Sequence, residues 1–157
     1  MSDKSLWKKV VLDEPRNPGR FFGAFLKRCT ATSTLSIKDL SSFGNMSADR
    51  LATIFRLPAL RRLYLDFPYD EAPWYEEGAL QRCLGGPGRL THLSLRVNRD
   101  NLVADILDVN RDSLQEAEIP AVLMNEGIPF FGPNKWTKLK IFPAEDSSHV
   151  LVDLVSR

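Results

Sequence analysis

Apolar residues recur along the chain in a six-residue pattern, with apolar side chains at the first, fourth and sixth positions. The pattern is complete at Leu60, Leu63 and Leu65 and again at Leu90, Leu93 and Leu95, where Asn98 extends it. Degenerate copies hold Trp7, Val10 and Leu12; Thr32, Leu35 and Ile37; Leu114, Ala117 and Ile119; and Trp136, Leu139 and Ile141. Their starts at 7, 32, 60, 90, 114 and 136 are 25, 28, 30, 24 and 22 residues apart. Such a near-regular interval is typical of stacked repeats, each hexad being one strand.

Between the hexads, apolar residues recur at helical spacing, so strands and helices are expected to alternate. The helical faces are Phe21, Phe22, Phe25 and Leu26; Leu51, Ile54 and Phe55; Leu80, Cys83 and Leu84; Leu102, Ile106 and Leu107; and Val150, Leu151, Leu154 and Val155. Ser47 is expected to cap the helix that contains Leu51. Gly and Pro predict loops at 15–19, 41–45, 85–88 and 127–133, and at most a short helical turn over 121–126.

A single strand-helix unit of this kind cannot fold alone. Ordering about 25 residues costs on the order of 25 to 50 kcal/mol of backbone entropy, whereas a buried Leu contributes only about 1.5 to 3 kcal/mol. Stacked units bury both flanks against their neighbours. The L-x-x-L-x-L grammar therefore predicts an α/β leucine-rich-repeat solenoid of about six irregular repeats. We expect a short parallel concave sheet, helices on the convex side, and one domain spanning residues 1–157.

The alternation of side chains along a strand also predicts which residues face outward. They are Lys9 and Val11, Thr34 and Ser36, Arg62 and Tyr64, His92 and Ser94, Glu116 and Glu118, and Lys138 and Lys140, with Asp66 and Arg96 on the rim. Arg and Tyr are common interface anchors, so we interpret this face, from Arg62 to Lys140, as a partner-binding surface. The alternative is that its charges only solvate an exposed sheet and pair across neighbouring strands.

The segment from Leu6 to Leu12, followed by the expected helix at 21–28, resembles the leucine-rich-repeat region of fungal-type F-box proteins. The resemblance implies the substrate-recognition part of a cullin-RING ubiquitin ligase subunit, in which an F-box docks the adaptor. The first repeat begins at Trp7, which leaves no room for an F-box, so adaptor docking is expected only if one is supplied upstream. The alternative is a truncated or degenerate repeat protein that acts within a larger assembly or by self-association.

Composition and charge exclude several classes of protein. With 43% hydrophobic and 26% charged residues the chain is of the globular type, and its net charge of +1 gives no global field for nucleic acid. Cys29 and Cys83 are the only cysteines and form no CxxC pattern, so we expect them reduced and buried. No signal peptide or membrane span is apparent. A cytoplasmic or nuclear protein with a protein partner is therefore expected.

Candidate catalytic chemistry is sparse. His92 and His149 are the only histidines. His149 begins an apolar helical segment, while His92 lies on the expected concave face, where Glu116 or Glu118 of the next strand could join it in binding a metal or moving a proton. No P-loop, nucleophile elbow or zinc motif is present, and the glycines at 85–88 indicate a turn. We therefore expect no enzyme activity, cofactor or metal.

Overall fold

The computed structural model of the chain describes residues 7–12, 18–38, 47–66, 75–97, 100–120 and 137–142. It is an α/β protein with six strands, β1 Lys9–Leu12, β2 Thr34–Ile37, β3 Arg62–Asp66, β4 His92–Arg96, β5 Glu116–Pro120 and β6 Lys138–Phe142. The helices are α1 Pro18–Arg28, η2 Cys29–Ala31, α2 Ala48–Phe55, α3 Ala79–Leu84 and α4 Asp100–Val109. The expected helix at 150–155, the loops at 41–45 and 127–133, the turn at 121–126, Asn98, Trp136 and His149 lie outside the described residues.

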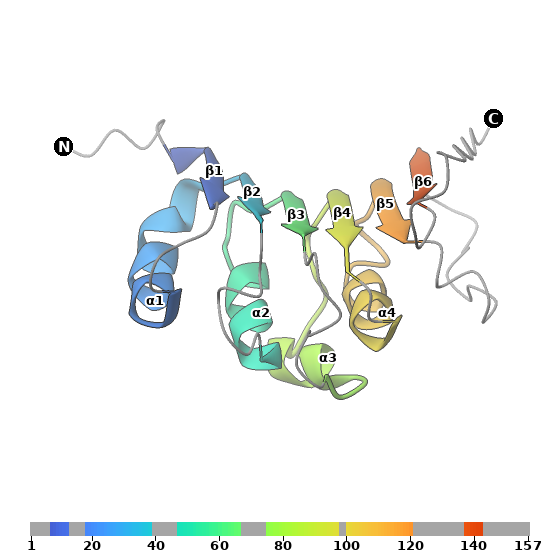
Figure 1. The fold of residues 1–157 in the computed structure, drawn as a ribbon, viewed down its shortest axis with the longest axis horizontal. Coiled ribbons are helices and arrows are strands. Elements are labelled where there is room, and N and C mark those ends of the chain that lie inside the picture. Colours follow the sequence, from blue (N-terminus) through green and yellow to red (C-terminus); the bar gives the residue numbers. More distant parts are fainter. Residues whose placement is uncertain are drawn as a thin grey trace.

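The strands form one parallel sheet in chain order, β1-β2-β3-β4-β5-β6, which confirms the expected α/β class and a strand at every hexad. The register aligns equivalent hexad positions, so that Leu35, Leu63, Leu93, Ala117 and Leu139 form one row. All four α-helices lie on the same side of the row of strands (Figure 1). All-parallel sheets usually carry helices on both faces. Here no described helix covers the opposite face, which we call the outer face.

One hydrogen-bond pattern fastens each strand to the next at its amino end. The carbonyl of Lys8 accepts two consecutive backbone amides, those of Ser33 and Thr34, at 2.9 and 3.0 Å. We call this arrangement, in which one carbonyl accepts two consecutive amides, a backbone fork. It recurs at the carbonyls of Ser33, Arg61, Thr91 and Gln115, which accept the amides of residues 61 and 62, 91 and 92, 115 and 116, and 137 and 138, respectively. The hydroxyls of Ser33, Thr91 and Thr137 donate to the same carbonyls. Successive strands are therefore joined with the same local geometry.

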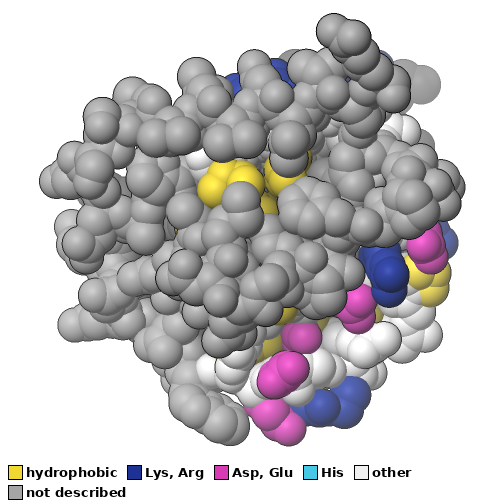
Figure 2. Space-filling model, turned by 90° about the vertical axis from the view of Figure 1, so that its right-hand side faces the viewer, with side chains coloured by type: hydrophobic (Ala, Val, Ile, Leu, Met, Phe, Trp, Pro, Cys, Tyr) yellow, Lys and Arg dark blue, Asp and Glu magenta, His cyan; other side chains and the backbone are white. Residues whose placement is uncertain are grey.

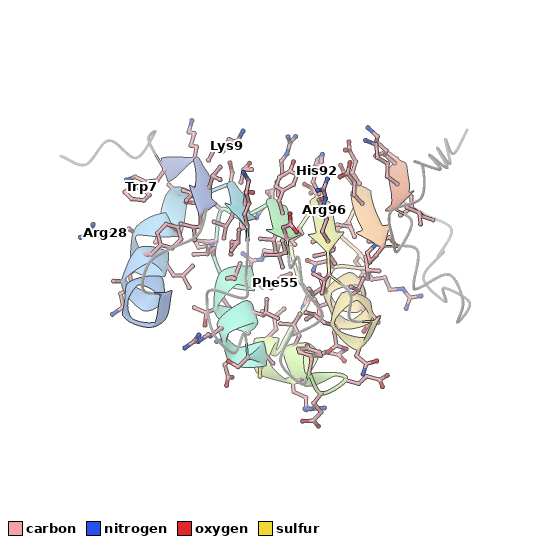
Figure 3. The ribbon with its side chains drawn as sticks, in the orientation of Figure 1. Trp7, Lys9, Arg28, Phe55, His92 and Arg96 are labelled. Carbon is pink, nitrogen blue, oxygen red and sulfur yellow. The ribbon has the colours of Figure 1, made fainter. Side chains whose placement is uncertain are left out.

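The core lies between the sheet and the helices. Both inward side chains of each strand from β2 to β6 are buried, as are Leu60, Leu90 and Leu114 at the first hexad position. Thr32 takes that position before β2, and its buried hydroxyl donates to the Trp7 carbonyl at 2.6 Å. Phe55 of α2 lies between the helical layer and the strands (Figure 3). The inward phase expected from the hexads is therefore confirmed.

The helices lie where the apolar spacing places them, with two differences. α1 begins at Pro18, so the predicted loop at 15–19 is wrong at its last two residues, because Pro is favoured in the first turn of a helix. Cys29 is buried as expected, but Cys83 is only partly buried at the end of the short helix α3. The Ser47 cap is confirmed, since its hydroxyl accepts from the Arg50 amide at 3.4 Å. None of the helices in the described ranges is both long and apolar enough to cross a membrane.

Two buried polar side chains on the helical side fix the approach to β4 and the start of α3. Asn110 accepts from the Leu90 amide at 3.1 Å and donates to the Ile106 carbonyl at 2.8 Å. A Cβ atom at Gly88 would collide with the side-chain amide oxygen of Asn110, so the position of Asn110 requires a glycine at residue 88. Asp105 accepts from the Tyr75 hydroxyl at 2.8 Å and the Gly78 amide at 2.9 Å.

Candidate functional site: the outer face of the sheet

The outer face consists of two side-chain rows that run across the strands. Register places Lys9, Thr34, Arg62, His92, Glu116 and Lys138 in the first row. The second row holds Val11, Ser36, Tyr64, Ser94, Glu118 and Lys140, and Asp66 pairs with Arg96 beyond it. Lys9 and His92 are seen on the side of the strands away from the helices (Figure 3). The ten residues expected to bind a partner thus come from four adjacent strands, β3 to β6.

Exposure varies along this face. Arg62, Arg96 and Lys138 are exposed, whereas Asp66, His92, Ser94, both glutamates and Lys140 are half-buried by their neighbours. Tyr64 is 39% exposed and Val11 is 49% exposed, and these are the two exposed large hydrophobic side chains in the described residues. Seen from the β6 end, Lys and Arg side chains appear along the upper edge, on the outer side of the sheet (Figure 2). The face therefore combines accessible aromatic and cationic groups.

Charges pair across the strands at the β4–β6 end. The His92 Nε2 atom lies 3.4 Å from Glu116 Oε1, and the Lys140 Nζ atom lies 3.1 Å from Glu118 Oε1. The Ser94 hydroxyl donates to the other oxygen of Glu118 at 3.1 Å. This is the cross-strand pairing that the solvating alternative predicts. At this end the face supplies partners for its own carboxylates.

The neighbouring strand β3 differs. Neither Arg62 nor Tyr64 makes a side-chain hydrogen bond or an ion pair with any described residue. The adjacent Arg61, by contrast, donates to the Leu60 carbonyl at 2.7 Å and to the Pro58 carbonyl at 3.3 Å. A guanidinium and a phenol whose donors meet no described acceptor thus lie two residues apart on one face of the same strand.

A small hollow lies beside this pair. It is lined by Tyr64, His92, Leu93, Ser94, Glu116, Ala117, Glu118 and Lys138 and has a volume of about 60 Å³. Sites for organic cofactors and drug-sized ligands are roughly 300 to 1,000 Å³. The hollow has room for one side chain of a binding partner or for a few water molecules. It is too small to enclose an organic cofactor.

The polar side chains around the hollow interact with one another through hydrogen bonds and an ion pair. The His92 Nδ1 atom lies 2.8 Å from the Thr91 hydroxyl, and Nε2 faces Glu116, so both ring nitrogens have partners. The Ser94 hydroxyl points its proton at Glu118, so it forms no nucleophile–base pair with the histidine. Within the described ranges, no group of three or more His, Cys, Asp or Glu side chains could hold a metal ion.

Three of the described groups on the helical side of the sheet have a pKa that is shifted from its ordinary value. Burial raises the pKa of the Cys29 thiol, and a hydrogen bond with Asp49 raises that of Cys83. Both cysteines are free thiols. Burial and the hydrogen bond to Asp105 raise the pKa of Tyr75 well above its ordinary value. These shifts favour the neutral forms and point to packing rather than to reactivity.

Sequence reasoning missed the polar contacts that organise the site. The Ser or Thr one residue before β2, β4 and β6 is a recurrent signal that could have been found. That Arg62 meets no described partner carries no such signal, because it depends on which side chains reach it in space. The chain matches no protein-family model, and comparison with curated proteins and with solved structures finds no match either.

Proposed function

We propose that this chain is a leucine-rich-repeat solenoid that acts as a non-catalytic protein–protein interaction module, with the outer face as its recognition surface. The repeat interpretation is supported by the six strands spaced like the hexads and by the backbone fork that recurs at each strand junction. A quasi-one-dimensional stack of this kind offers an extended surface to partners. All helices in the described ranges lie on the other side of the sheet from that surface (Figure 1).

The observation that carries the proposal is that Arg62 and Tyr64 on β3 have no side-chain partner among the residues that the structure describes. Both glutamates of β5 have a basic partner within the face, whereas the Arg62 guanidinium makes no ion pair with a described residue and is available to a partner. Arg and Tyr are the residue types most often found to dominate binding energy, because they combine contact area with directed donors. We therefore place the centre of recognition on β3, next to the hollow.

The resemblance to fungal-type F-box proteins supports a narrower form of this proposal. In it, the module is the substrate-recognition part of a ubiquitin ligase subunit, with the target bound on the outer face. Docking to a cullin-RING adaptor requires an F-box supplied upstream. No cofactor is part of the proposal, and the engaged ring nitrogens of His92 support a non-catalytic role.

Affinity capture with a matched control tests the proposed surface. The tagged wild-type chain, an Arg62→Ala/Tyr64→Ala double variant and an Arg28→Ala control would each capture partners for quantitative mass spectrometry. Arg28 is an exposed arginine at the end of α1, away from the strand row (Figure 3). We expect the double variant to lose specific partners and the control to keep them. Identical partner sets for all three proteins would refute the assignment of this face.

A second candidate is self-association, or action within a larger assembly, through the ends of the sheet. Among the described residues, β1 and β6 each pair with one strand, so each presents an unpaired edge. Sedimentation velocity over a range of micromolar concentrations separates the two candidates. A single monomeric species favours the interaction module, whereas a concentration-dependent shift to larger species favours self-association.

A further inference from the structure

In the two rows of the outer face, the Lys, Arg, Asp and Glu side chains that make no ion pair with a described residue are all cations. The two rows hold two carboxylates, Glu116 and Glu118, and four side chains that are cations at neutral pH, Lys9, Arg62, Lys138 and Lys140. Glu118 pairs with Lys140, and Glu116 lies against His92. Lys9, Arg62 and Lys138 make no ion pair with any described side chain. A complementary partner therefore brings negative charge.

The spacing of these cations defines how that charge is arranged. Lys9 and Arg62 occupy the same row two strands apart, and neighbouring strands are about 4.8 Å apart, which separates them by roughly 10 Å. A peptide in the extended polyproline II conformation has three residues per turn and rises about 3.1 Å per residue, so carboxylates three residues apart point to the same side and lie roughly 9 Å apart. A chain segment crossing the strands can place one carboxylate at each cation.

The surroundings of Arg62 add an apolar requirement. Tyr64 lies two residues further along β3, on the same face; the residue is 39% exposed and lines the small hollow. Leu93 and Ala117 are among the residues that line the hollow. A peptide whose carboxylate meets Arg62 therefore has an aromatic surface within reach for a neighbouring aliphatic side chain.

We propose that the outer face binds an extended acidic segment of a protein partner, with carboxylates three residues apart on Lys9 and Arg62 and an aliphatic side chain on Tyr64. The inference rests on the proposed function and specifies the chemistry of its partner. An Arg guanidinium with unused donors can bind a carboxylate through two parallel hydrogen bonds.

A peptide fits this face better than a nucleic acid does. Glu116 lies in the same row as Arg62 and Lys138, between these two cations. A polynucleotide carries a phosphate at every step and would meet this carboxylate, which is unfavourable. A peptide can place a neutral residue there. The face therefore selects a partner whose negative charge is discontinuous.

Selection from a random peptide library at physiological ionic strength tests the proposal. We expect the wild-type chain to enrich peptides with Asp or Glu at positions i and i+3 and an aliphatic residue next to one of them. Fluorescence anisotropy with the enriched peptide then measures affinity. We expect Arg62→Glu to weaken binding about tenfold or more, as the loss of an Arg anchor does. Arg28→Glu, which makes the same charge change away from the face, should leave affinity within about twofold.

A charge swap sharpens the test. Replacing the acidic residue at one of the two positions by Lys should weaken binding to wild type and restore binding to the Arg62→Glu variant. Circular dichroism confirms that both variants stay folded, which is expected because Arg62 and Arg28 are exposed. Recovery of affinity in the swapped pair places the peptide carboxylate at Arg62.

Different results would overturn different parts of the proposal. A non-acidic consensus whose binding Tyr64→Ala abolishes would overturn the acidic partner while leaving the recognition surface in place. The absence of any enriched peptide would overturn both. An acidic consensus indifferent to Arg62→Glu, or tighter binding of single-stranded oligothymidine than of the peptide, would also overturn the proposal.

Discussion

Leu93 and Ser94 are neighbours in β4, yet they lie on opposite faces of the sheet. Leu93 is 3% exposed and packs in the core, whereas Ser94 is half-buried and donates to a carboxylate of the next strand. The same division holds from β2 to β6, because register aligns every inward position with an inward one. The inner face packs against the helices in the core, and we expect the outer face to tolerate changes of charge.

The inner side should show the largest effect of mutation. Leu93→Ala removes a buried side chain that the surrounding strands and helices cannot fully replace, so we expect it to lower the free energy of unfolding by about 2 to 5 kcal/mol. Ser94→Ala, one residue away, should change it by less than about 0.5 kcal/mol. Urea denaturation of both variants measures the difference. Equal losses would show that the assignment of the two faces is wrong.

A buried polar residue should come next. Asn110→Ala leaves the Leu90 amide without its acceptor in the interior, and we expect a loss of about 1 to 3 kcal/mol of unfolding free energy. Arg111→Ala, at the exposed position that follows, is the control and should stay within about 0.5 kcal/mol. If the two variants unfold at the same denaturant concentration, Asn110 does not hold the approach to β4.

Tyr75 extends the comparison to alkaline pH. Its pKa is raised above the ordinary value of 10.0 in the folded state, first by burial and then by Asp105. The protonated phenol therefore stabilises the fold fully below about pH 10, and this stabilisation is lost as pH rises further. We expect Tyr75→Phe to cost about 1 to 2 kcal/mol at pH 8 and less at pH 11. A cost that does not change with pH would contradict this.

The cross-strand pair of the outer face should show the smallest effect. A double-mutant cycle with Glu118→Gln and Lys140→Met should give a coupling energy of about 0.2 to 1 kcal/mol, because both side chains are partly exposed. The coupling should fall in high salt. A value as large as the cost of Leu93→Ala would mean that the outer face also holds the fold together.

The strands and their facing follow from sequence because they depend on local periodicity. Six hexads lead to six strands, and Leu63 and Leu65 face inward as their spacing requires. The start of α1 was misjudged because Pro18 is compatible with both a loop and a first helical turn. The hydrogen bonds of Asn110 with Leu90 and of Asp105 with Tyr75 and Gly78 join residues 20 to 30 positions apart, which no local pattern encodes.

The candidate site divides in the same way. Alternation identifies which residues of β3 to β6 share the outer face, because side-chain direction is fixed by position in the strand. It does not show that Glu116 meets His92, or that Arg62 meets no described charge. The charges that neighbour these residues in the sequence do not indicate which side chains will meet in space. Those pairings depend on register and on side-chain reach, and only the folded arrangement shows them.

Thiol accessibility along β4 tests most directly whether the strands divide into a packed face and an open one. Leu93→Cys and Ser94→Cys would each be introduced into a Cys83→Ser background, in which the remaining Cys29 is buried. We expect the Ser94→Cys variant to react with a disulfide reagent in the native protein, and the Leu93→Cys variant to react only on unfolding. Equal native reactivity of the two variants would contradict the division on which the fold and the proposed recognition surface depend.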